Sequence, residues 1–167
     1  MSNGYALGRA ALALVPDTAP EPTPTVWFCS HCGSHEDTED EAPRSRVCGD
    51  CGLGVLLETS AEIAPGSDGA FLVLDQNLSV CAVSAAAERL LATSETEAVN
   101  RHLTQLLVPA DSETSGPANL ASAVTWAANG DDVPHTVTVR PATTFGIRLS
   151  ARIAHCSPPR AALLVFD

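Results

Sequence analysis

The sequence predicts an α+β protein in two parts, a small metal-binding ribbon near the N-terminus and a larger domain that begins and ends with strands. Two observations lead to this. Two Cys-x-x-Cys pairs, Cys29/Cys32 and Cys48/Cys51, are separated by fifteen residues. After residue 68 the pattern reads strand, strand, helix, two short helical pieces, a longer helix and three strands.

The cysteine spacing predicts a structural Zn²⁺ site. A tetrahedral Zn²⁺ is held by four thiolates, and two Cys-x-x-Cys turns supply them. Gly33 and Gly52 follow the pairs, and a positive φ at each would let backbone N–H groups point at sulfur. His31 and His35 are expected to stay unligated. Two other interpretations are a rubredoxin-like iron site, which lacks its aromatic shell here, and two disulfides, which would need a secreted protein. The metal ligands expected are Cys29, Cys32, Cys48 and Cys51.

Composition narrows the class of partner. The formal charge is −11, and residues 26–60 hold seven acids against two arginines, so nucleic acid is a poor partner and proteins are better ones. No segment has the length and apolarity of a membrane span or the pattern of a signal peptide, so we expect a cytoplasmic protein. All nine basic residues are arginine, a bias that resembles a high-GC bacterium.

Four regions are expected along the chain. Residues 1–25 are rich in proline and alanine and predict a disordered tail. The zinc ribbon spans 26–59 and a short linker spans 60–67. The larger domain spans 68–167.

The larger domain opens with a predicted hairpin and a capped helix. The run GAFLVLD, a turn at Asp75, and the run LSVCAVS read as two paired strands. Ser84 is placed to cap a helix over 85–92. Two short helical pieces are expected over 95–99 and 103–107.

The remaining elements follow from periodicity. Pro117 at a first-turn position and a terminating Gly130 predict a helix over 117–128. Alternation predicts a strand near 136–140 and another over 145–154, each with one wet face. The run 161–166 does not alternate, so both of its sides should be covered.

The segment Gly69 to Leu91, GAFLVLDQNLSVCAVSAAAERLL, resembles the opening hairpin and first helix of the PAS domain. The likeness covers residues 68–167. It implies a PAS-like five-stranded antiparallel sheet in the order 2-1-5-4-3, with helices on one face and a pocket between. The family senses ligands, light, redox state or partners and transmits through dimer contacts; it shares no common chemistry, so the resemblance implies no enzyme.

Cofactor signatures of the family can be checked on this chain. The flavin photosensors carry an Asn-Cys-Arg stretch, which is absent. The haem branch uses a histidine on the connecting helix, and none lies between Pro117 and Gly130. His102 is expected to be a surface residue. No flavin or haem is therefore expected.

Four further side chains carry structural expectations. Trp27 is expected to fasten the ribbon onto the sheet, and Trp126 to lie in the core. Cys81 and Cys156 are expected to remain unbridged thiols.

The outer face of the predicted sheet, the side without helices, is the candidate docking surface. Strands 71–74 and 161–166 are apolar on both sides, and such an uncovered stripe is a liability in water. Arg140, Arg148 and Arg152 should line its polar half. The occupant would be the tail, the ribbon or a second protomer, with the arginines meeting the acidic loop 37–41.

These observations predict a non-catalytic regulatory or sensory protein. It would couple a structural zinc ribbon to a PAS-like domain for ligand sensing or dimerisation, and act through protein contacts. The alternative is a thiol switch in which oxidation of the four cysteines releases the metal. No catalytic constellation stands out, so no enzyme is predicted.

Overall fold

The computed structural model describes residues 23–36, 42–110 and 119–167. Most of the predicted tail, the acidic loop 37–41 and Pro117 lie outside these ranges. The strands are β1 (Thr25–Cys29), β2 (His35–Glu36), β3 (Leu56–Ser60), β4 (Phe71–Leu74), β5 (Val80–Val83), β6 (Leu107–Pro109), β7 (His135–Pro141), β8 (Leu149–Ser157) and β9 (Ala161–Phe166). The helices are α1 (Ala85–Leu91), α2 (Glu95–Ala98), the 3₁₀ helix η1 (Leu103–Gln105) and α3 (Leu120–Ala128).

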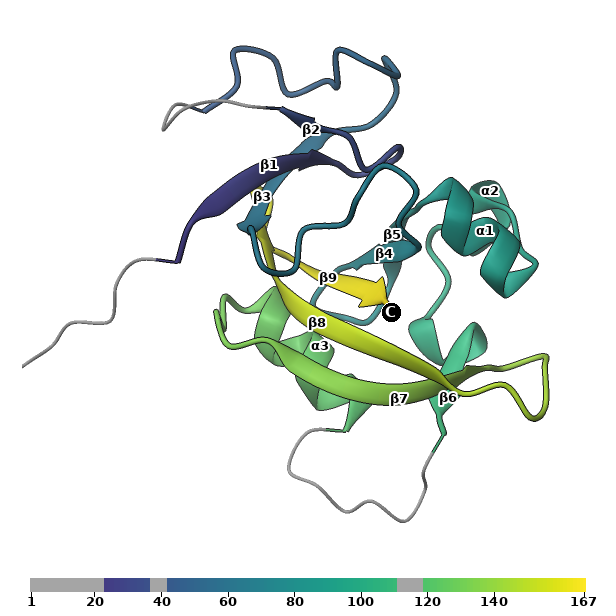
Figure 1. The fold of residues 1–167 in the computed structure, drawn as a ribbon. Helices are drawn as coiled ribbons and strands as arrows, with labels where there is room; N and C mark the ends of the chain where they lie inside the picture. Colours follow the sequence, from purple (N-terminus) through teal and green to yellow (C-terminus); the bar gives the residue numbers. More distant parts are fainter. Residues whose placement is uncertain (1–22, 37–41, 111–118) are drawn as a thin grey trace, which may run out of the picture.

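All of these strands join one antiparallel sheet. Its order is β2-β1-β3-β8-β9-β4-β5, with β7 also on β8 and β6 on β7. The strands of the larger domain therefore run β5-β4-β9-β8-β7, which is the order 2-1-5-4-3 that the resemblance implied. The curled sheet with its few helices is a PAS-like α+β fold (Figure 1).

Ser84 and Asn119 set the starts of the two longer helices. The Ser84 hydroxyl accepts a hydrogen bond from Ala87 N at 3.1 Å, as expected of an N-cap. Asn119 caps α3 in the same way through Ser122 N at 2.8 Å. Its extended backbone, with φ −75° and ψ 164°, breaks the helical conformation there. The predicted start of this helix at 117 is therefore wrong, and α3 begins at Leu120.

The predicted strand over 145–154 also begins too early. Phe145 is 87% exposed and Ile147 is 44% exposed. They belong to the loop between β7 and β8, where Gly146 has a φ of +83° that interrupts the extended chain. Conversely, β6 was not predicted; its Leu107 pairs with Pro141 of β7.

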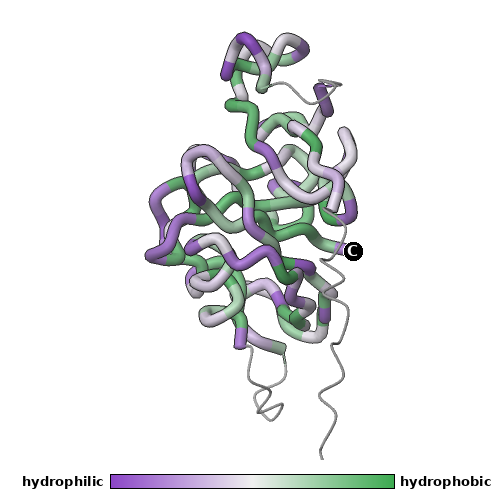
Figure 2. Tube along the Cα trace, turned by 90° about the vertical axis from the view of Figure 1, so that its left-hand side faces the viewer, coloured by the Kyte–Doolittle hydropathy of each residue, from purple (hydrophilic) through white to green (hydrophobic). Residues whose placement is uncertain are grey.

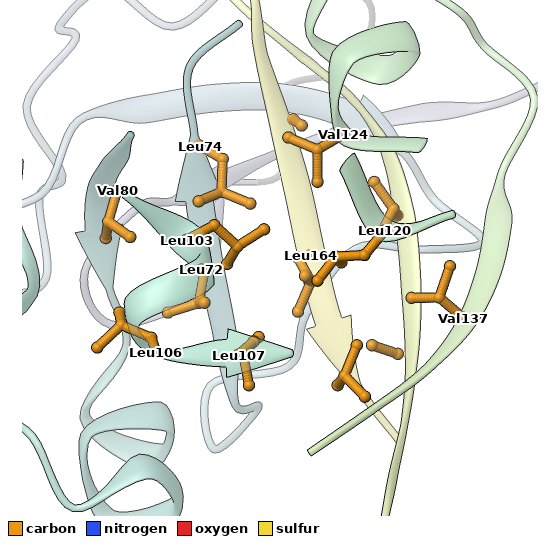
Figure 3. Close-up of a cluster of buried hydrophobic side chains, with 14 of the residues drawn as sticks. Leu72, Leu74, Val80, Leu103, Leu106, Leu107, Leu120, Val124, Val137 and Leu164 are labelled. Atoms are coloured by element: carbon orange, nitrogen blue, oxygen red, sulfur yellow. The ribbon is translucent and has the colours of Figure 1, made fainter. Parts of the chain in front are cut away.

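The main core lies between the sheet and the helices (Figure 3). Leu72, Leu74 and Leu164 project from β4 and β9 onto this side and are fully buried. Ala123 and Ala127 of α3 are also fully buried, and their small side chains let the helix lie close to the strands. Hydrophobic segments accordingly run through the middle of the molecule, with polar ones in outlying loops (Figure 2).

A second core lies on the opposite, outer face of the sheet. Val73, Leu163 and Val165 are at most 5% exposed there, although none of the helices that the structure describes covers them. The ribbon covers them instead. Phe28 of β1 is fully buried, and its ring meets that of Phe71 edge to face at 5.8 Å between centroids. Both sides of β4 and β9 are therefore covered, as was predicted for the run 161–166.

The ribbon also extends the sheet itself. β3 pairs with the end of β8, Glu58 opposite Ser157 and Thr59 opposite Cys156. The Thr59 hydroxyl donates to the His155 carbonyl at 2.8 Å. In the segment 60–67, expected to be a linker, Ser60 ends β3 and the Ile63 side chain is fully buried in the outer core.

Two expectations about tryptophan are wrong. Successive side chains of a strand point to opposite faces, so the neighbour of Phe28, Trp27, faces away from the outer core toward Cys29, Cys48 and Leu56. Phe28 fastens the ribbon. Trp126 is 40% exposed, and its ring lies 5.3 Å from that of His135 at the start of β7.

Candidate metal centre

The four predicted ligands come together at one end of the ribbon. The sulfur atoms of Cys29, Cys32, Cys48 and Cys51 all lie within 4.8 Å of one another. Cys29 Sγ and Cys51 Sγ are 3.6 Å apart, and Cys32 Sγ and Cys48 Sγ are 3.8 Å apart. Four sulfurs at about 2.3 Å from a tetrahedral ion would be about 3.8 Å from each other. The cluster therefore has dimensions that fit one metal ion.

The two cysteine turns have the same local geometry. Gly33 N donates to the Cys29 carbonyl and Gly52 N to the Cys48 carbonyl, both at 3.0 Å. Both glycines have positive φ, +71° and +67°, as the sequence predicted. His31 N and Cys32 N lie 3.4 Å from Cys29 Sγ and donate to it. N–H groups pointing at sulfur stabilise the thiolate form that binds metal.

Gly54 makes a close approach that sequence reasoning missed. A Cβ atom at this position would collide with Cys29 Sγ and lie 2.9 Å from His31 N. Its own N–H donates to Cys51 Sγ at 3.4 Å, and its carbonyl accepts from Cys48 N at 2.9 Å. The pattern Cys-Gly-x-Gly after the second pair was the available signal. Gly54 thus permits the two turns to close on each other.

The thiols differ in their readiness to ionise. Burial raises the pKa of Cys29 to about 12, against the opposing N–H donors of Cys32 and His31. Burial also acts to raise the pKa of Cys48, but the Ser34 hydroxyl and the N–H groups of Cys51 and Asp50 outweigh it and lower the value to about 6. The Gly54 and Leu53 N–H groups lower the pKa of Cys51. A buried Cys29 thiolate beside these would need a cation to compensate its charge.

The first cysteine turn also contacts the helices of the larger domain. His31 Nδ1 lies 3.3 Å from Glu95 Oε2 of α2, while Glu95 Oε1 accepts from Val83 N of β5 at 3.3 Å. His35 Nε2 is hydrogen bonded to the Pro65 carbonyl at 2.7 Å. Both histidines therefore have partners outside the sulfur cluster.

Arg46 ties the ribbon to the turn between β8 and β9. Its guanidinium stacks over the Trp27 ring at 5.4 Å. Nη2 donates to the Leu56 carbonyl at 2.7 Å and also to the Pro158 carbonyl. This contact joins the second cysteine turn to the larger domain, as His31 does for the first.

The three arginines of the predicted docking surface have different surroundings. Arg152 Nε donates to Asp167 Oδ1 at 2.7 Å, and its Nη1 donates to the Glu62 carbonyl at 3.0 Å. Arg140 lies over the Phe145 ring at 5.3 Å. Arg148 is exposed in the neighbouring loop. The acidic loop expected to meet them lies outside the described residues.

Two cavities of about 360 Å³ each open at the rim of the molecule. One lies between β3 and the turn before β7, and Glu58, Glu62, Asp132 and His155 are among its lining residues. The other lies beside α1 and η1, with Glu97, Arg101 and Gln105 in its wall. His102, expected at the surface, is exposed and caps η1.

The free thiols outside the cluster are Cys81 and Cys156. Cys156 is fully buried in the outer core, and Cys81 is exposed on β5. Among the helices that the structure describes, none is long and apolar enough to cross a membrane.

Comparison with known proteins finds similar structures only. No protein-family model and no curated protein matches the chain. The PAS domain of nitrogen regulation protein NR(II) from Vibrio parahaemolyticus is 21% identical, over 65% of this chain and 98% of that one, with a TM-score of 0.45. A domain of a sensory box sensor histidine kinase/response regulator from Geobacter sulfurreducens is 14% identical, over 62% and 85%, with a TM-score of 0.44.

The PAS domain of an HTR-like protein from Haloarcula marismortui is also similar, at 16% identity over 59% of this chain and 84% of that one, with a TM-score of 0.40. With TM-scores below 0.5, these similarities add no weight to the assignment of the fold. The PAS-like architecture rests on the strand order and register of the chain itself.

Proposed function

We propose that this chain is a non-catalytic regulatory protein in which a structural zinc ribbon is built into a PAS-like sensing domain, and that it acts through contacts with other proteins. The observation that carries this is the position of the four-sulfur cluster. It lies at the end of the ribbon strands whose other residues cover the outer face of the PAS-like sheet.

Zinc would act as the clamp that keeps this cover in place. Among the residues that the structure describes, the apolar group around the cluster is small: Cys29, Cys48 and Leu56 are buried, and Trp27 packs against them. These are too few side chains to hold the ribbon ends together without metal. Four cysteine ligands fill a tetrahedral shell and leave no position for water, which favours a structural role over catalysis.

The sensing role follows from how the ribbon is attached. The first cysteine turn contacts α2 through His31 and Glu95, and the second contacts the β8–β9 turn through Arg46. A change in metal occupancy would thereby alter the contacts of the ribbon with both α2 and the β8–β9 turn. A change in the packing of α2 would likewise alter the affinity of the cysteine cluster for the metal.

The partner surface is restricted by the same arrangement. A homodimer through the outer face would need apolar surface that the ribbon of the same chain already buries, such as Leu163 and Val165. Partners would instead use the polar half of that face. A net charge of −11 favours proteins over nucleic acid, and we place the protein in the cytoplasm, where thiols stay reduced.

A thiol switch is the second candidate, and one observation favours it. Cys32 and Cys51 are partly exposed, whereas Cys29 and Cys48 are buried, so an oxidant has a route to two of the four sulfurs. Mild peroxide should then release the metal while the PAS-like sheet keeps its circular dichroism. Retention of metal up to peroxide levels that unfold the whole chain would eliminate the switch.

The test of the main proposal begins with metal content. Protein purified without chelator should hold one zinc per chain, and Cys48→Ser should hold far less. Removal of zinc should expose the outer core to a hydrophobic dye, while Cys81→Ser, at an exposed thiol outside the cluster, should behave as wild type. Absence of a stoichiometric divalent ion, or cysteines already bridged to each other, would refute the proposal.

A further inference from the structure

The two cysteine turns differ in how a hydrogen-bond donor reaches the second sulfur of each pair. In the second turn, Gly54 N lies three residues after Cys51 and donates to Cys51 Sγ at 3.4 Å. The corresponding residue of the first turn is His35, where β2 begins and pairs with Phe28. Among the described residues, no backbone N–H group is hydrogen bonded to Cys32 Sγ. Any donor to this sulfur in the described structure is therefore a side chain.

The Ser34 hydroxyl lies against one sulfur of each turn. Ser34 Oγ is 3.1 Å from Cys32 Sγ and 3.4 Å from Cys48 Sγ. Those two sulfurs are 3.8 Å apart, so the oxygen and the two sulfurs form a nearly equilateral triangle. A cysteine bound to a metal ion is a thiolate and can only accept hydrogen bonds. With metal bound, the hydroxyl is therefore the donor in either contact.

The backbone of the first turn and the larger domain together fix the place of Ser34. Its carbonyl accepts a hydrogen bond from Cys29 N at 2.9 Å. Gly33, directly before it, has a φ of +71°, and a Cβ there would lie 2.6 Å from the Gly66 carbonyl oxygen and 3.2 Å from the Phe71 ring. The turn is thus packed closely against the start of the larger domain, and the serine side chain reaches the sulfurs from a fixed backbone.

We propose that the Ser34 hydroxyl determines how firmly the cysteine cluster holds its metal, by donating a hydrogen bond to the sulfurs of Cys32 and Cys48. Four thiolates around one Zn²⁺ leave about two negative charges on the site. A donor that points at sulfur offsets part of this charge and makes the sulfur a weaker nucleophile. Ser34 acts through the ligands and does not contact the metal. The inference rests on the proposed function, because it names a residue that sets the affinity of the proposed zinc site.

Ser30 offers a matched comparison in the same turn. Its hydroxyl accepts a hydrogen bond from Val55 N at 3.0 Å, and its side chain is buried. Ser30 therefore ties the first turn to the chain that follows the second turn, through a backbone N–H group instead of a sulfur. Ser30→Ala removes a structural tie between the turns, whereas Ser34→Ala removes a donor to sulfur. An effect on the sulfur atoms themselves is what separates the two variants.

Zinc affinity of the full chain is measured by competition with a chromophoric chelator. Ser34→Ala should bind zinc about tenfold more weakly than wild type, as is usual when a group hydrogen bonded to a metal ligand is removed. Ser34→Thr keeps the hydroxyl and should lose much less. Ser45→Ala changes an exposed serine whose hydroxyl is hydrogen bonded to the Val47 carbonyl, and this variant should bind zinc as wild type does.

Cobalt substitution tests whether the hydroxyl acts on sulfur or only on the fold. Co²⁺ bound by thiolates has a sulfur-to-metal charge-transfer absorption, whose energy falls as the sulfurs become better electron donors. Ser34→Ala should therefore shift this band to longer wavelength, whereas Ser30→Ala should leave its position unchanged even where binding is weaker. Iodoacetamide labelling followed by mass spectrometry gives a second readout. In zinc-loaded Ser34→Ala, Cys32 should be modified faster than in wild type, with the rate at Cys51 unchanged.

Three results would overturn the proposal. They are equal zinc affinity of Ser34→Ala and wild type, a Co²⁺ band that Ser34→Ala leaves in place, and a loss of affinity as large in Ser34→Thr as in Ser34→Ala. Any of them, obtained with wild-type protein that holds one zinc per chain, would remove the role of Ser34 and leave the proposed function standing. Wild-type protein without a stoichiometric metal ion would instead refute the proposed function itself.

Discussion

Gly54 shows how one residue without a side chain can decide whether a four-cysteine site closes. The site needs two turns to approach until their sulfurs are about 3.8 Å apart. Gly54 of the second turn lies directly against Cys29 and His31 of the first. A spacing rule for cysteines finds the ligands but not this requirement, because the close approach exists only between the two folded turns.

Replacing Gly54 by alanine should therefore weaken zinc binding. The added Cβ would displace Cys29 Sγ or the His31 backbone, and disturbing the surroundings of a ligand costs about tenfold or more in metal affinity. Competition with a chromophoric chelator measures the change. Gly49→Ala is the control, because a Cβ there meets nothing closer than Glu36 Oε1 at 3.8 Å. Equal affinity of the two variants would contradict this account of Gly54.

Of the two thiols outside the cysteine cluster, Cys156 should be the less reactive in the folded chain. Burial raises its pKa to about 12 from an ordinary value of 9.0. At pH 8 iodoacetamide should therefore modify Cys156 only after unfolding, whereas the exposed Cys81 should react in the native protein. Mass spectrometry of the labelled peptides distinguishes the two sites. Labelling of Cys156 in the native state would mean that the ribbon opens from the sheet.

The same raised pKa makes stability depend on pH in alkaline solution. The unfolded chain loses the Cys156 proton near pH 9 and the folded chain only near pH 12, so the folded state holds more protons between these values. The free energy of unfolding should accordingly be unaffected by this group below pH 9 and fall as the pH rises from 9 to 12. Cys156→Ala, measured by urea denaturation over this range, should remove that part of the decline.

β1 supplies the ribbon's main anchor through one of its two aromatic side chains. Phe28 points into the outer core and Trp27 points toward the cysteine cluster. Phe28→Ala should lower the free energy of unfolding by about 3–5 kcal/mol, as is usual for a buried phenylalanine. Trp27→Ala should cost less, since its side chain is only partly buried. Urea unfolding of both variants with zinc bound measures the two losses. A larger loss of unfolding free energy for Trp27→Ala would mean that Trp27, and not Phe28, anchors the ribbon.

Most elements of the larger domain could be predicted from the sequence because each has a local cause. Ser84 caps α1 as expected, and the unbroken apolar run of β9 correctly predicted a strand covered on both sides. The alternation of Phe145 and Ile147 predicted strand but belongs to a loop. Alternation alone cannot distinguish a buried strand end from an exposed hairpin tip, because apolar and polar residues alternate along both.

The identity of the cover on the outer face could not be predicted. The apolar stripe required some occupant, and the tail, the ribbon and a second protomer all satisfied that requirement. The choice depends on the pairing of β3 with β8 and on Phe28 rather than Trp27 facing inward. A shift of one residue in the pairing would exchange the two faces of a strand, and nothing in the local sequence fixes that register.

Taken whole, the molecule has two cores on the two faces of one sheet, and the proposed metal would clamp only the second. The helix-side core joins α1, α2 and α3 to the strands, whereas the outer core depends on Phe28, Leu57 and Ile63 from the ribbon side. The strands between the cores, β4 and β9, are thus shared. The PAS-like domain is therefore incomplete without the ribbon, since one face of its central strands would be left in water.

Residues 68–167 expressed without the ribbon should accordingly associate with themselves. Val73 and Val165, 3% and 5% exposed in the full chain, would then face solvent. Exposed apolar strands of this kind drive association. We expect concentration-dependent oligomers by sedimentation and strong binding of a hydrophobic dye. Val73→Thr/Val165→Thr keeps the β-branched shape, so it should reduce both effects while retaining the fold. A monomeric fragment that unfolds cooperatively and binds no dye would show that the ribbon is dispensable to the sheet, and that the zinc clamp acts on the ribbon alone.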